Sequence, residues 1–302
     1  MRFDAIIVGG SFAGLSAATY LGRARRSVLV LDAGQPRNRF SRHAHGFLGQ
    51  DGRKPGDILK LARNQLAAYP TVLFRHGTAT GAHRAAGGGF CIELNDGQRF
   101  DADRIILAHG VSDDLPAHPG IRERWGRSVL HCPYCHGFEV AGRRLGVLHT
   151  PRMPASHAAL IAEWGPTTLF LDGHGLDPQF AHDLTGRGVT IEPEAVIGLD
   201  GEGDTLASVQ LASGRRVSLD AMFIGAPTRL SSDLADRLGC AIDDSPLGSV
   251  VRTDDRKQTT VAGVYAAGDV ARSPHSVAWA VGDGAMAGVA VHQSLVFPAL
   301  AA

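Results

Sequence analysis

Two cysteines separated by two residues form the most reactive pattern in the chain. Cys132 and Cys135 stand in the stretch LHCPYCHGFE (130–139), with His131 before the pair and His136 directly after it. Zinc needs about four ligands, and two cysteines with two flanking histidines would give a cramped cluster. A purely structural disulfide is unusual in a chain with four cysteines in all and no disulfide framework. Of these three uses, we favour a redox-active pair.

Redox chemistry at this pair would require a thiolate and a group that moves protons. We expect the pair to stand at the start of a helix, where the positive end of the helix dipole favours a thiolate. Pro133 suits the first turn of such a helix because it has no N–H group. His136 could take a proton from an incoming thiol and return it to a leaving thiolate. Glu139 is a second candidate for that role, and an ordinary solvated position is the alternative for either residue.

A glycine-rich turn near the N-terminus predicts nucleotide binding. The stretch VGGSFAGLSAA follows a short apolar strand at 4–8 and precedes small and apolar residues at helical spacing. It resembles the pattern G-x-G-x-x-G, in which Gly9 allows the tight turn and Gly14 lets the helix approach the strand. Ser11 replaces the middle glycine, and its hydroxyl could contact a phosphate at the helix N-terminus. Asp32 ends the next strand, where an acidic side chain would bind the adenosine ribose.

The order of the apolar segments predicts an α/β protein with two Rossmann-like domains of the FAD/NAD(P)-binding type, the second inserted into the first. A strand, turn, helix and strand open the chain, and a second α/β pattern follows later. A long helix of small residues at 276–296 then returns to the first domain. We expect residues 1–112 and 228–302 to form the first domain. Residues 113–227, with the cysteine pair near their start, would form the inserted one.

Composition narrows the classes of partner. Of the 302 residues 44% are hydrophobic, and 30 Lys and Arg balance 30 Asp and Glu. A formal net charge of zero gives no field that would draw nucleic acid or an anionic membrane. No run of about 18 apolar residues could span a bilayer, and the chain enters a buried strand almost at once, which leaves no room for a signal peptide. We expect a cytoplasmic protein that binds neither nucleic acid nor membrane.

Three motifs, in order along the whole chain, carry a resemblance to a known family. IIVGGSFAGLSAA near the N-terminus, CPYC at 132–135 and GVYAAGDVA at 263–271 together resemble the low-molecular-weight thioredoxin reductase-like flavoproteins. The resemblance implies an FAD-binding domain in two segments, an inserted NAD(P)-type domain and a homodimer. It also implies that the cysteine pair exchanges electrons with the flavin, with Cys135 nearer the flavin and Cys132 meeting the substrate. The family usually has Asp after the second cysteine, where this chain has His136.

The resemblance further implies which residues bind FAD. The glycine turn binds the cofactor, Asp269 lies on its ribityl and phosphate portion, and the loop 34–52 runs past its ring. His109 replaces the Thr of the family's A-T-G strand end, and His275 stands in a glutamine position at the pyrimidine end of the flavin. The expected FAD-binding residues are Gly9, Ser11, Ala13, Gly14, Asp32, Asn38, His45, Gly268, Asp269, His275, Ser276 and Val277, with Arg37 and Asp51 as further loop candidates.

The inserted domain lacks both halves of the NADPH site that the family carries. No glycine occurs between Val147 and Trp164, and Pro151 and Pro154 occupy the expected turn. Proline there removes N–H groups that would hold a pyrophosphate. The next strand end, TTLFLDGHGLD, contains Asp172 and neither Arg nor Lys, although the family places a basic cluster there for the 2′-phosphate of NADPH. We predict that NADPH binding is lost, with an altered binding mode as the alternative.

Together these features predict an FAD-dependent thiol–disulfide oxidoreductase that oxidises a dithiol. The stretch CPYCHGFE resembles the dithiol oxidases that close disulfides in gliotoxin- and holomycin-type natural products. Substrate thiols would reduce the pair by exchange, the pair would reduce FAD, and oxygen would accept the electrons. The alternatives are an NAD(P)H-dependent thioredoxin-disulfide reductase and a non-catalytic flavin redox-sensing module. The partner would be a dithiol or disulfide, whether a small molecule, a peptide or a thioredoxin-like protein.

Overall fold

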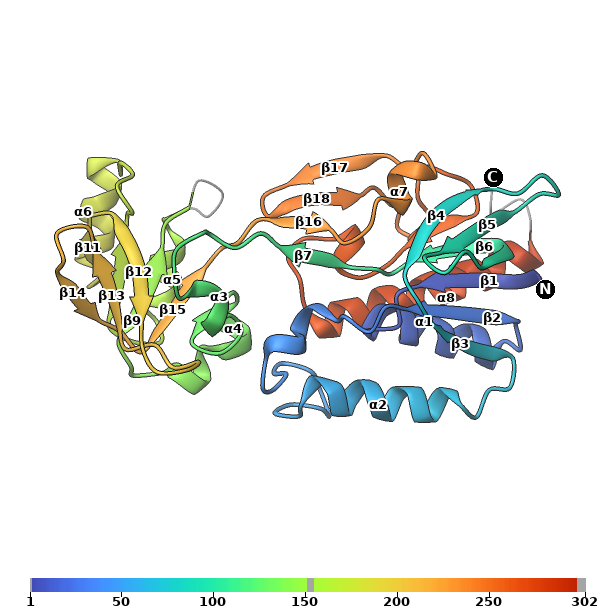
Figure 1. Ribbon diagram of the computed structural model, residues 1–302, viewed down its shortest axis with the longest axis horizontal. Coiled ribbons are helices and arrows are strands. Elements are labelled where there is room, and N and C mark those ends of the chain that lie inside the picture. Colours follow the sequence, from blue (N-terminus) through green and yellow to red (C-terminus); the bar gives the residue numbers. More distant parts are fainter. Residues whose placement is uncertain (1, 151–154, 298–302) are drawn as a thin grey trace. The chain divides into compact units, whose positions relative to one another are not determined.

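The computed structural model describes residues 2–150 and 155–297 and divides the chain into two compact units (Figure 1). Within these described ranges, no helix is both long and apolar enough to cross a membrane. The larger part of unit 2 interrupts unit 1 in the sequence, so one domain is inserted into the other. Unit 1 comprises Met1–Arg39, Pro55–Ser112 and Thr228–Ala302, and unit 2 comprises Phe40–Lys54 and Asp113–Pro227.

Unit 1 is built on a seven-stranded, mainly parallel sheet. Its strands are β1 (Arg2–Val8), β2 (Val28–Asp32), β3 (Val72–His76), β4 (Ala79–Arg84), β5 (Phe90–Leu94), β6 (Arg99–Leu107) and β19 (Val264–Ala266). They run in the order β3-β2-β1-β6-β5-β4, with β19 also paired to β6. The first half of β6 pairs with antiparallel β5, Ala102 opposite Phe90, and its second half pairs with parallel β19, Ile105 opposite Val264. The central strands are rich in Val, Ile and Leu because both of their faces are buried.

Two long helices of unit 1 lie side by side (Figure 1). They are α1 (Phe12–Arg23) and α8 (Val277–Val296). Small residues allow the approach: a Cβ atom on Gly288 would lie 2.8 Å from the carbonyl oxygen of Ala17, and one on Gly284 would overlap that of Ala13. The remaining elements of unit 1 are α2 (Pro55–Leu66), α7 (Leu234–Arg237), the 3-10 helices η1 (Arg37–Phe40) and η3 (Asp269–Ala271), and a small sheet in the order β17-β18-β16-β7, formed by Ile242–Ser245, Gly248–Val251, Thr228–Leu230 and Val111–Asp113.

Unit 2 has its own parallel sheet and its own core. The sheet runs in the order β11-β10-β9-β15-β8, and a separate three-stranded sheet has the order β12-β13-β14. Apolar clusters on the two sides of the parallel sheet form the core. The strands are β8 (Val129–Leu130), β9 (Leu145–Leu148), β10 (Thr167–Phe170), β11 (Thr190–Glu192), β12 (Val196–Asp200), β13 (Ser208–Leu211), β14 (Arg216–Ser218) and β15 (Ala221–Ile224). The helices are α3 (Ile121–Arg124), α4 (Pro133–His136), η2 (Phe138–Val140), α5 (His157–Ile161) and α6 (Pro178–Gly186).

The segment 40–54 groups with unit 2, although the sequence led us to expect it within the first segment of the first domain. Phe40 packs against Gly126, where a Cβ atom would lie 2.9 Å from the Cβ of Phe40. Arg42 forms an ion pair with Asp204. The segment is polar and has no hydrophobic periodicity, so these tertiary contacts, and not a local pattern, decide which unit it joins.

Candidate functional site

Neighbouring strands of unit 1 end at one edge of its sheet, and the expected nucleotide-binding residues stand there. Asp32 ends β2, Gly9 follows β1, His109 follows β6 and Gly268 follows β19. These four strands are adjacent and parallel in the sheet. Ligands of parallel α/β sheets bind outside the carboxyl ends of the strands. This edge is therefore the candidate cofactor site.

The turn between β1 and α1 brings backbone so close together that side chains are excluded. Gly9 has a φ of 115°, and a Cβ atom there would overlap the carbonyl oxygen of Ala108. A Cβ atom on Gly14 would overlap the carbonyl oxygen of Gly9. Ser11 is the N-cap of α1, and its side chain makes no capping hydrogen bond to any described residue. The N–H groups at the start of α1 are therefore open to a dinucleotide pyrophosphate.

The carboxylate of Asp32 is held from two sides. Its Oδ1 accepts a hydrogen bond from the N–H of Gly34 at 3.1 Å, and its Oδ2 accepts one from the Arg63 guanidinium. The same guanidinium donates to the carbonyl oxygen of Gly10 at 3.2 Å. Arg63 thus connects α2 both to the end of β2 and to the glycine turn.

Arg63 is a residue of the site that sequence reasoning missed. It lies four residues after Leu59 and three before Leu66, on the face of α2 that carries these buried leucines. A cation within an apolar helix face is unusual unless it meets a partner. The place of this arginine among buried leucines was the feature of the sequence that could have revealed its role.

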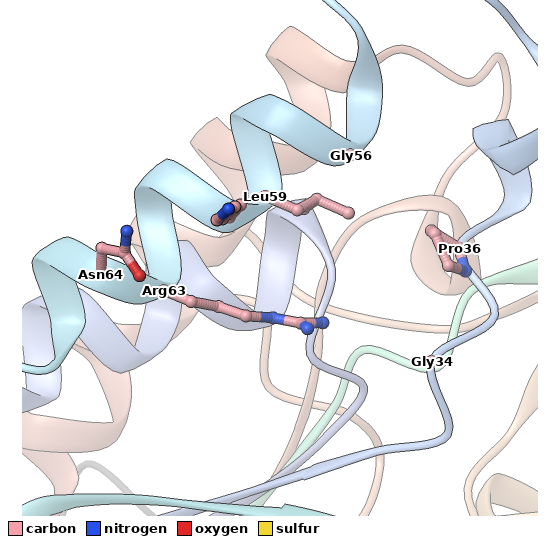
Figure 2. Close-up of a pocket in the computed structure, with 7 residues that line it drawn as sticks. Gly34, Pro36, Gly56, Leu59, Arg63 and Asn64 are labelled. Atoms are coloured by element: carbon pink, nitrogen blue, oxygen red, sulfur yellow. The ribbon is translucent and has the colours of Figure 1, made fainter.

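A pocket of about 310 Å³ lies between α2 and the loop after β2 (Figure 2). Figure 2 shows Arg63 reaching from the helix toward the loop that carries Gly34 and Pro36. Since Asp32 stands at the start of that loop, the pocket adjoins the adenosine end of the expected FAD site. The lining residues are Gly34, Pro36, Gly56, Leu59, Lys60, Arg63 and Asn64.

The other end of the expected FAD site combines the first and last segments of unit 1. A Cβ atom on Gly268 would lie 2.8 Å from the Cβ of Ala13, so the end of β19 closely approaches the start of α1. Asp269 follows, and its carboxylate lies 3.3 Å from the Arg37 guanidinium. Asn38 has a buried Oδ1 with no hydrogen-bond partner among the described residues. Such an acceptor needs a donor, so Asn38 fits a ligand with N–H or O–H groups, as FAD has.

His275, Ser276 and Val277 stand at the start of α8. Ser276 is the N-cap and Val277 is the first residue of this 20-residue helix. A helix of this length carries partial positive charge at its N-terminus, which suits the electron-accepting end of a flavin. Together with the glycine turn and Asn38, these residues fit FAD.

Cys132 and Cys135 form a disulfide directly after β8, with their Cα atoms 5.3 Å apart. Cys132 is the N-cap of α4 and Pro133 its first residue, as predicted. The helix has only four residues before the chain continues into η2, so it favours a thiolate less than a full helix would. The other two cysteines, Cys91 and Cys240, are free and buried, and burial raises the pKa of both thiols.

His136, at the end of α4, belongs to a cluster with Glu139 and His45. Burial lowers the pKa of His136; the Glu139 carboxylate opposes this shift, and His45 adds to it. The Nε2 of His45 lies 3.4 Å from the Oε1 of Glu139, and the Nδ1 of His45 lies 3.7 Å from the Oδ2 of Asp51. The ring centroids of His45 and His136 are 6.4 Å apart. The sequence made His45 and Asp51 candidates along the flavin, and the structure places both in the unit that carries the cysteines.

The carboxyl ends of β10 and β11 in unit 2 carry acidic side chains. The Oδ1 of Asp172 accepts a hydrogen bond from the N–H of Val196 at 2.8 Å, and its Oδ2 lies 3.0 Å from the Nε2 of His118. Glu192 is buried at the end of β11 and pairs with Arg215 at 2.6 Å. In a dinucleotide fold these strand ends are near the adenosine ribose. A 2′-phosphate placed there would meet carboxylates, whose partners Arg215 and His118 are already engaged by them.

The turn after β9 is described in part. Pro151 and Pro154, on which the prediction of a lost glycine turn rests, lie outside the described residues. The helix predicted over 155–165 is confined to α5, five residues from His157 to Ile161. So short a helix gives little dipole to stabilise a pyrophosphate.

Comparison with known proteins shows the family to which this chain belongs. A model of the pyridine nucleotide-disulphide oxidoreductase family matches residues 3–149 and 156–284. The chain belongs to the pyridine nucleotide-disulphide oxidoreductase family. This membership, with the two parallel sheets, confirms the predicted fold class of two Rossmann-like domains, one inserted into the other.

Similar members of the pyridine nucleotide-disulphide oxidoreductase family include two fungal proteins. The chain is 32% identical over 302 residues to thioredoxin reductase tcpT of Claviceps purpurea, covering 94% of this chain and 92% of the relative. It is 30% identical over 307 residues to thioredoxin reductase sirT of Leptosphaeria maculans, covering 96% and 93%. These relatives confirm the predicted thioredoxin reductase-like resemblance, and the protein is an FAD-dependent oxidoreductase of this kind.

Two solved structures resemble the structure of this chain over nearly its full length. An oxidoreductase from Agrobacterium tumefaciens has 47% identity and a TM-score of 0.94, with 99% of this chain and 100% of that chain covered. HlmI has 35% identity and a TM-score of 0.91, with 98% and 93% covered.

Proposed function

We propose that the protein is an FAD-dependent dithiol oxidase that takes electrons from a substrate dithiol through Cys132 and Cys135 and delivers them to oxygen. The observation that carries the proposal is the acidic edge of unit 2. Asp172 and Glu192 stand at the strand ends where the 2′-phosphate of NADPH would require cations. Arg215 beside them is already paired with Glu192 and Glu194. An enzyme of this family that does not take hydride from NADPH needs another electron source, and a thiol can reduce the pair by exchange.

The chain's own residues account for the thiol chemistry. His136, whose pKa is lowered by burial, is neutral near pH 7 and accepts the proton of a substrate thiol. The thiolate attacks the Sγ of Cys132, the bond between the cysteines breaks, and Cys135 leaves as a thiolate. The second substrate thiol, on losing its proton, attacks the substrate sulfur of the mixed disulfide and releases Cys132.

The exchange as a whole converts the substrate dithiol and the Cys132–Cys135 disulfide into a substrate disulfide, two cysteine thiolates and two protons. FAD, when bound, supplies the route by which the two electrons of the pair reach oxygen, so that a dithiol and oxygen give a disulfide and hydrogen peroxide. Asp32, Asn38, Asp269 and the glycine turn would hold it.

The surface around the pair suits an apolar substrate. Tyr134 and Phe138, on either side of Cys135, are 74% and 85% exposed. The Tyr134 ring contacts Trp164 edge to face, with centroids 5.8 Å apart. Large exposed aromatic side chains beside a reactive group mark a surface for recognition. We infer a dithiol carried on an uncharged ring or an apolar peptide.

The second candidate is a disulfide reductase that receives electrons from NAD(P)H and serves a thioredoxin-like protein. The names of the curated relatives, which are thioredoxin reductases, favour it. The experiment that separates the two is anaerobic reduction of the flavin by NADPH, NADH and small dithiols, compared side by side. An oxidase is bleached by dithiols and not by either nucleotide, and it releases peroxide when air is admitted. Rapid bleaching by NADPH would establish the reductase instead.

We also propose that the protein works in the cytoplasm as a homodimer. Helix α8 exposes Trp279, Met286 and Val289, which are 46%, 46% and 38% exposed. A second copy covering this face would bury them. Sedimentation of wild type and of a Trp279→Ser variant would test it, since a dimer that uses α8 is weakened by the change.

A further inference from the structure

The segment 40–54 places a second histidine beside the one that follows the cysteine pair. His45 and His136 come from parts of the chain 91 positions apart, yet their rings meet edge to face at 82° with centroids 6.4 Å apart. His136 adjoins Cys135 in the sequence and ends α4. Two imidazoles this close cannot both carry a full charge without repulsion. Their protonation is therefore coupled.

The surroundings of the two rings differ in charge. Both ring nitrogens of His45 face a carboxylate: Nε2 faces Glu139 at 3.4 Å and Nδ1 faces Asp51 at 3.7 Å. His45 also contacts the ring of His43, with centroids 6.2 Å apart. A proton arriving at His45 thus meets negative charge on two sides. The Asp51 side chain is 67% exposed and borders solvent.

We propose that His45 is the positioning residue that keeps His136 available as a base, by relaying substrate protons from the His136 ring past Glu139 and Asp51 to solvent. This inference rests on the proposed thiol exchange at Cys132. The ring beside the cysteines removes protons, and the ring between two carboxylates passes them on. Each exchange frees two substrate protons, so a relay next to the base lets His136 act twice.

His45 and Glu139 affect the pKa of His136 in opposite directions, and these directions decide what each variant should do. His45 lowers the pKa of His136 and Glu139 raises it. Replacing His45 by Gln removes a positive neighbour, so His136 is protonated at a higher pH and is a poorer base in mild acid. Replacing Glu139 by Gln removes a negative neighbour and shifts the protonation of His136 to lower pH. The two variants therefore move the pH profile in opposite directions.

The experiment measures only the exchange step. The holoenzyme is mixed anaerobically with dithiothreitol at pH 5.5 to 9, quenched by alkylation, and the reduced Cys132–Cys135 pair is counted by mass. Dividing each variant's rate by that of wild type at the same pH cancels the ionisation of dithiothreitol. For His45→Gln we expect a ratio clearly below 1 at pH 6, where more of His136 is protonated than in wild type, rising toward 1 at pH 9. Free imidazole, added as an external base, should restore the exchange rate of His45→Gln at pH 6.

The controls separate this role from a structural one. His182→Gln makes the same change at an exposed position of α6 in the same unit and should give a flat ratio near 1. For Glu139→Gln the acid limb should move to lower pH. A ratio for His45→Gln that is low at all pH values, or a shift of both variants in the same direction, overturns the proposal. Because neither oxygen nor NADPH takes part, the outcome is independent of whether the enzyme is an oxidase or a reductase.

Discussion

The guanidinium of Arg63 binds the carboxylate of Asp32 and the carbonyl oxygen of Gly10, so that helix α2 is fastened to the glycine-rich turn. The glycines of the turn have no room for side chains: a Cβ atom on Gly10 would lie 2.7 Å from the Cβ of Asp32. The position of the turn therefore depends on backbone and on one long cation. The pocket beside Arg63 adjoins the same carboxylate (Figure 2).

Replacing Arg63 by Met should weaken FAD binding about tenfold or more, because a charge-assisted hydrogen bond to Asp32 is lost and contributes about 1.5–3 kcal/mol. Fluorescence titration of the apoprotein with FAD measures this. Arg75→Met is the matched control, since Arg75 forms an exposed ion pair with Asp96 in the same unit. An unchanged dissociation constant for Arg63→Met would show that the ion pair serves folding and not the cofactor.

Replacing Cys135 by Ser should trap the substrate on the protein. Cys132 then retains its thiol and cannot re-form the intramolecular disulfide. Incubation with the disulfide of a monothiol, whose other half departs as a free thiol, should give a stable mixed disulfide at Cys132, seen as added mass on intact protein. Steady-state turnover should fall at least about 100-fold, because an interaction essential to the reaction is removed. In Cys132→Ser, the same treatment should leave the protein without adduct. Adduct on Cys135 in that variant would reverse the assignment of the two roles.

Replacing Phe138 by Ser should change substrate recognition and leave the fold intact. The side chain is 85% exposed, and surface substitutions usually alter the free energy of unfolding by no more than about 0.5 kcal/mol. KM for an apolar cyclic dithiol should rise about three- to tenfold, whereas KM for dithiothreitol, which offers little apolar surface, should stay the same. Leu48→Ser, at an even more exposed side chain in the same unit (97%), is the control. Equal effects on both substrates would contradict a recognition role for Phe138.

Lowering the pH should destabilise the protein through His109. Burial lowers the pKa of His109 to about 4, while its Nδ1 donates to the carbonyl oxygen of Gly110. The unfolded chain takes up a proton below about pH 6.5, and the folded chain does so only near pH 4. The free energy of unfolding therefore falls as the pH drops through this window, by about 2 kcal/mol at pH 5.

The measurement for His109 is the melting temperature at pH 7 and pH 5 with FAD in excess. In His109→Gln the drop between the two should be smaller than in wild type by about 4–8 °C, whatever the variant's stability at pH 7. His83→Gln, at an exposed position of β4, should show the wild-type drop. An identical drop in His109→Gln would mean that other groups cause the acid sensitivity.

Local patterns predict most of the scaffold. The glycine turn predicts the β1–α1 connection because only glycine fits where Cβ atoms would overlap carbonyl oxygens at Gly9 and Gly14. The long run of small residues at 276–296 predicts α8, which is found at Val277–Val296. Pro133 predicts the helix start after Cys132. In each case the determining contacts are close in the sequence or are imposed by backbone sterics.

The residues around these elements are harder to predict because long-range contacts place them. The contact between His45 and Glu139 spans 94 positions, and nothing in the composition of the 40–54 segment indicates which unit it joins. Arg63 reaches Asp32 only once α2 has packed. The predicted helix at 155–165 shortens to His157–Ile161, although its apolar residues have helical spacing. Periodicity indicates a preferred face but not where tertiary contacts end an element.

The grouping of 40–54 with 113–227 has a practical consequence for dividing the protein. A fragment excised at residues 113 and 227 would lack His45 and leave the contact surfaces of Gly126 and Asp204 without Phe40 and Arg42. The chain passes between the two units at four points, after residues 39, 54, 112 and 227. A single protease cut at any one of these points therefore leaves the units joined through the other three. A stand-alone version of the cysteine-bearing unit must be a two-segment graft with a new linker.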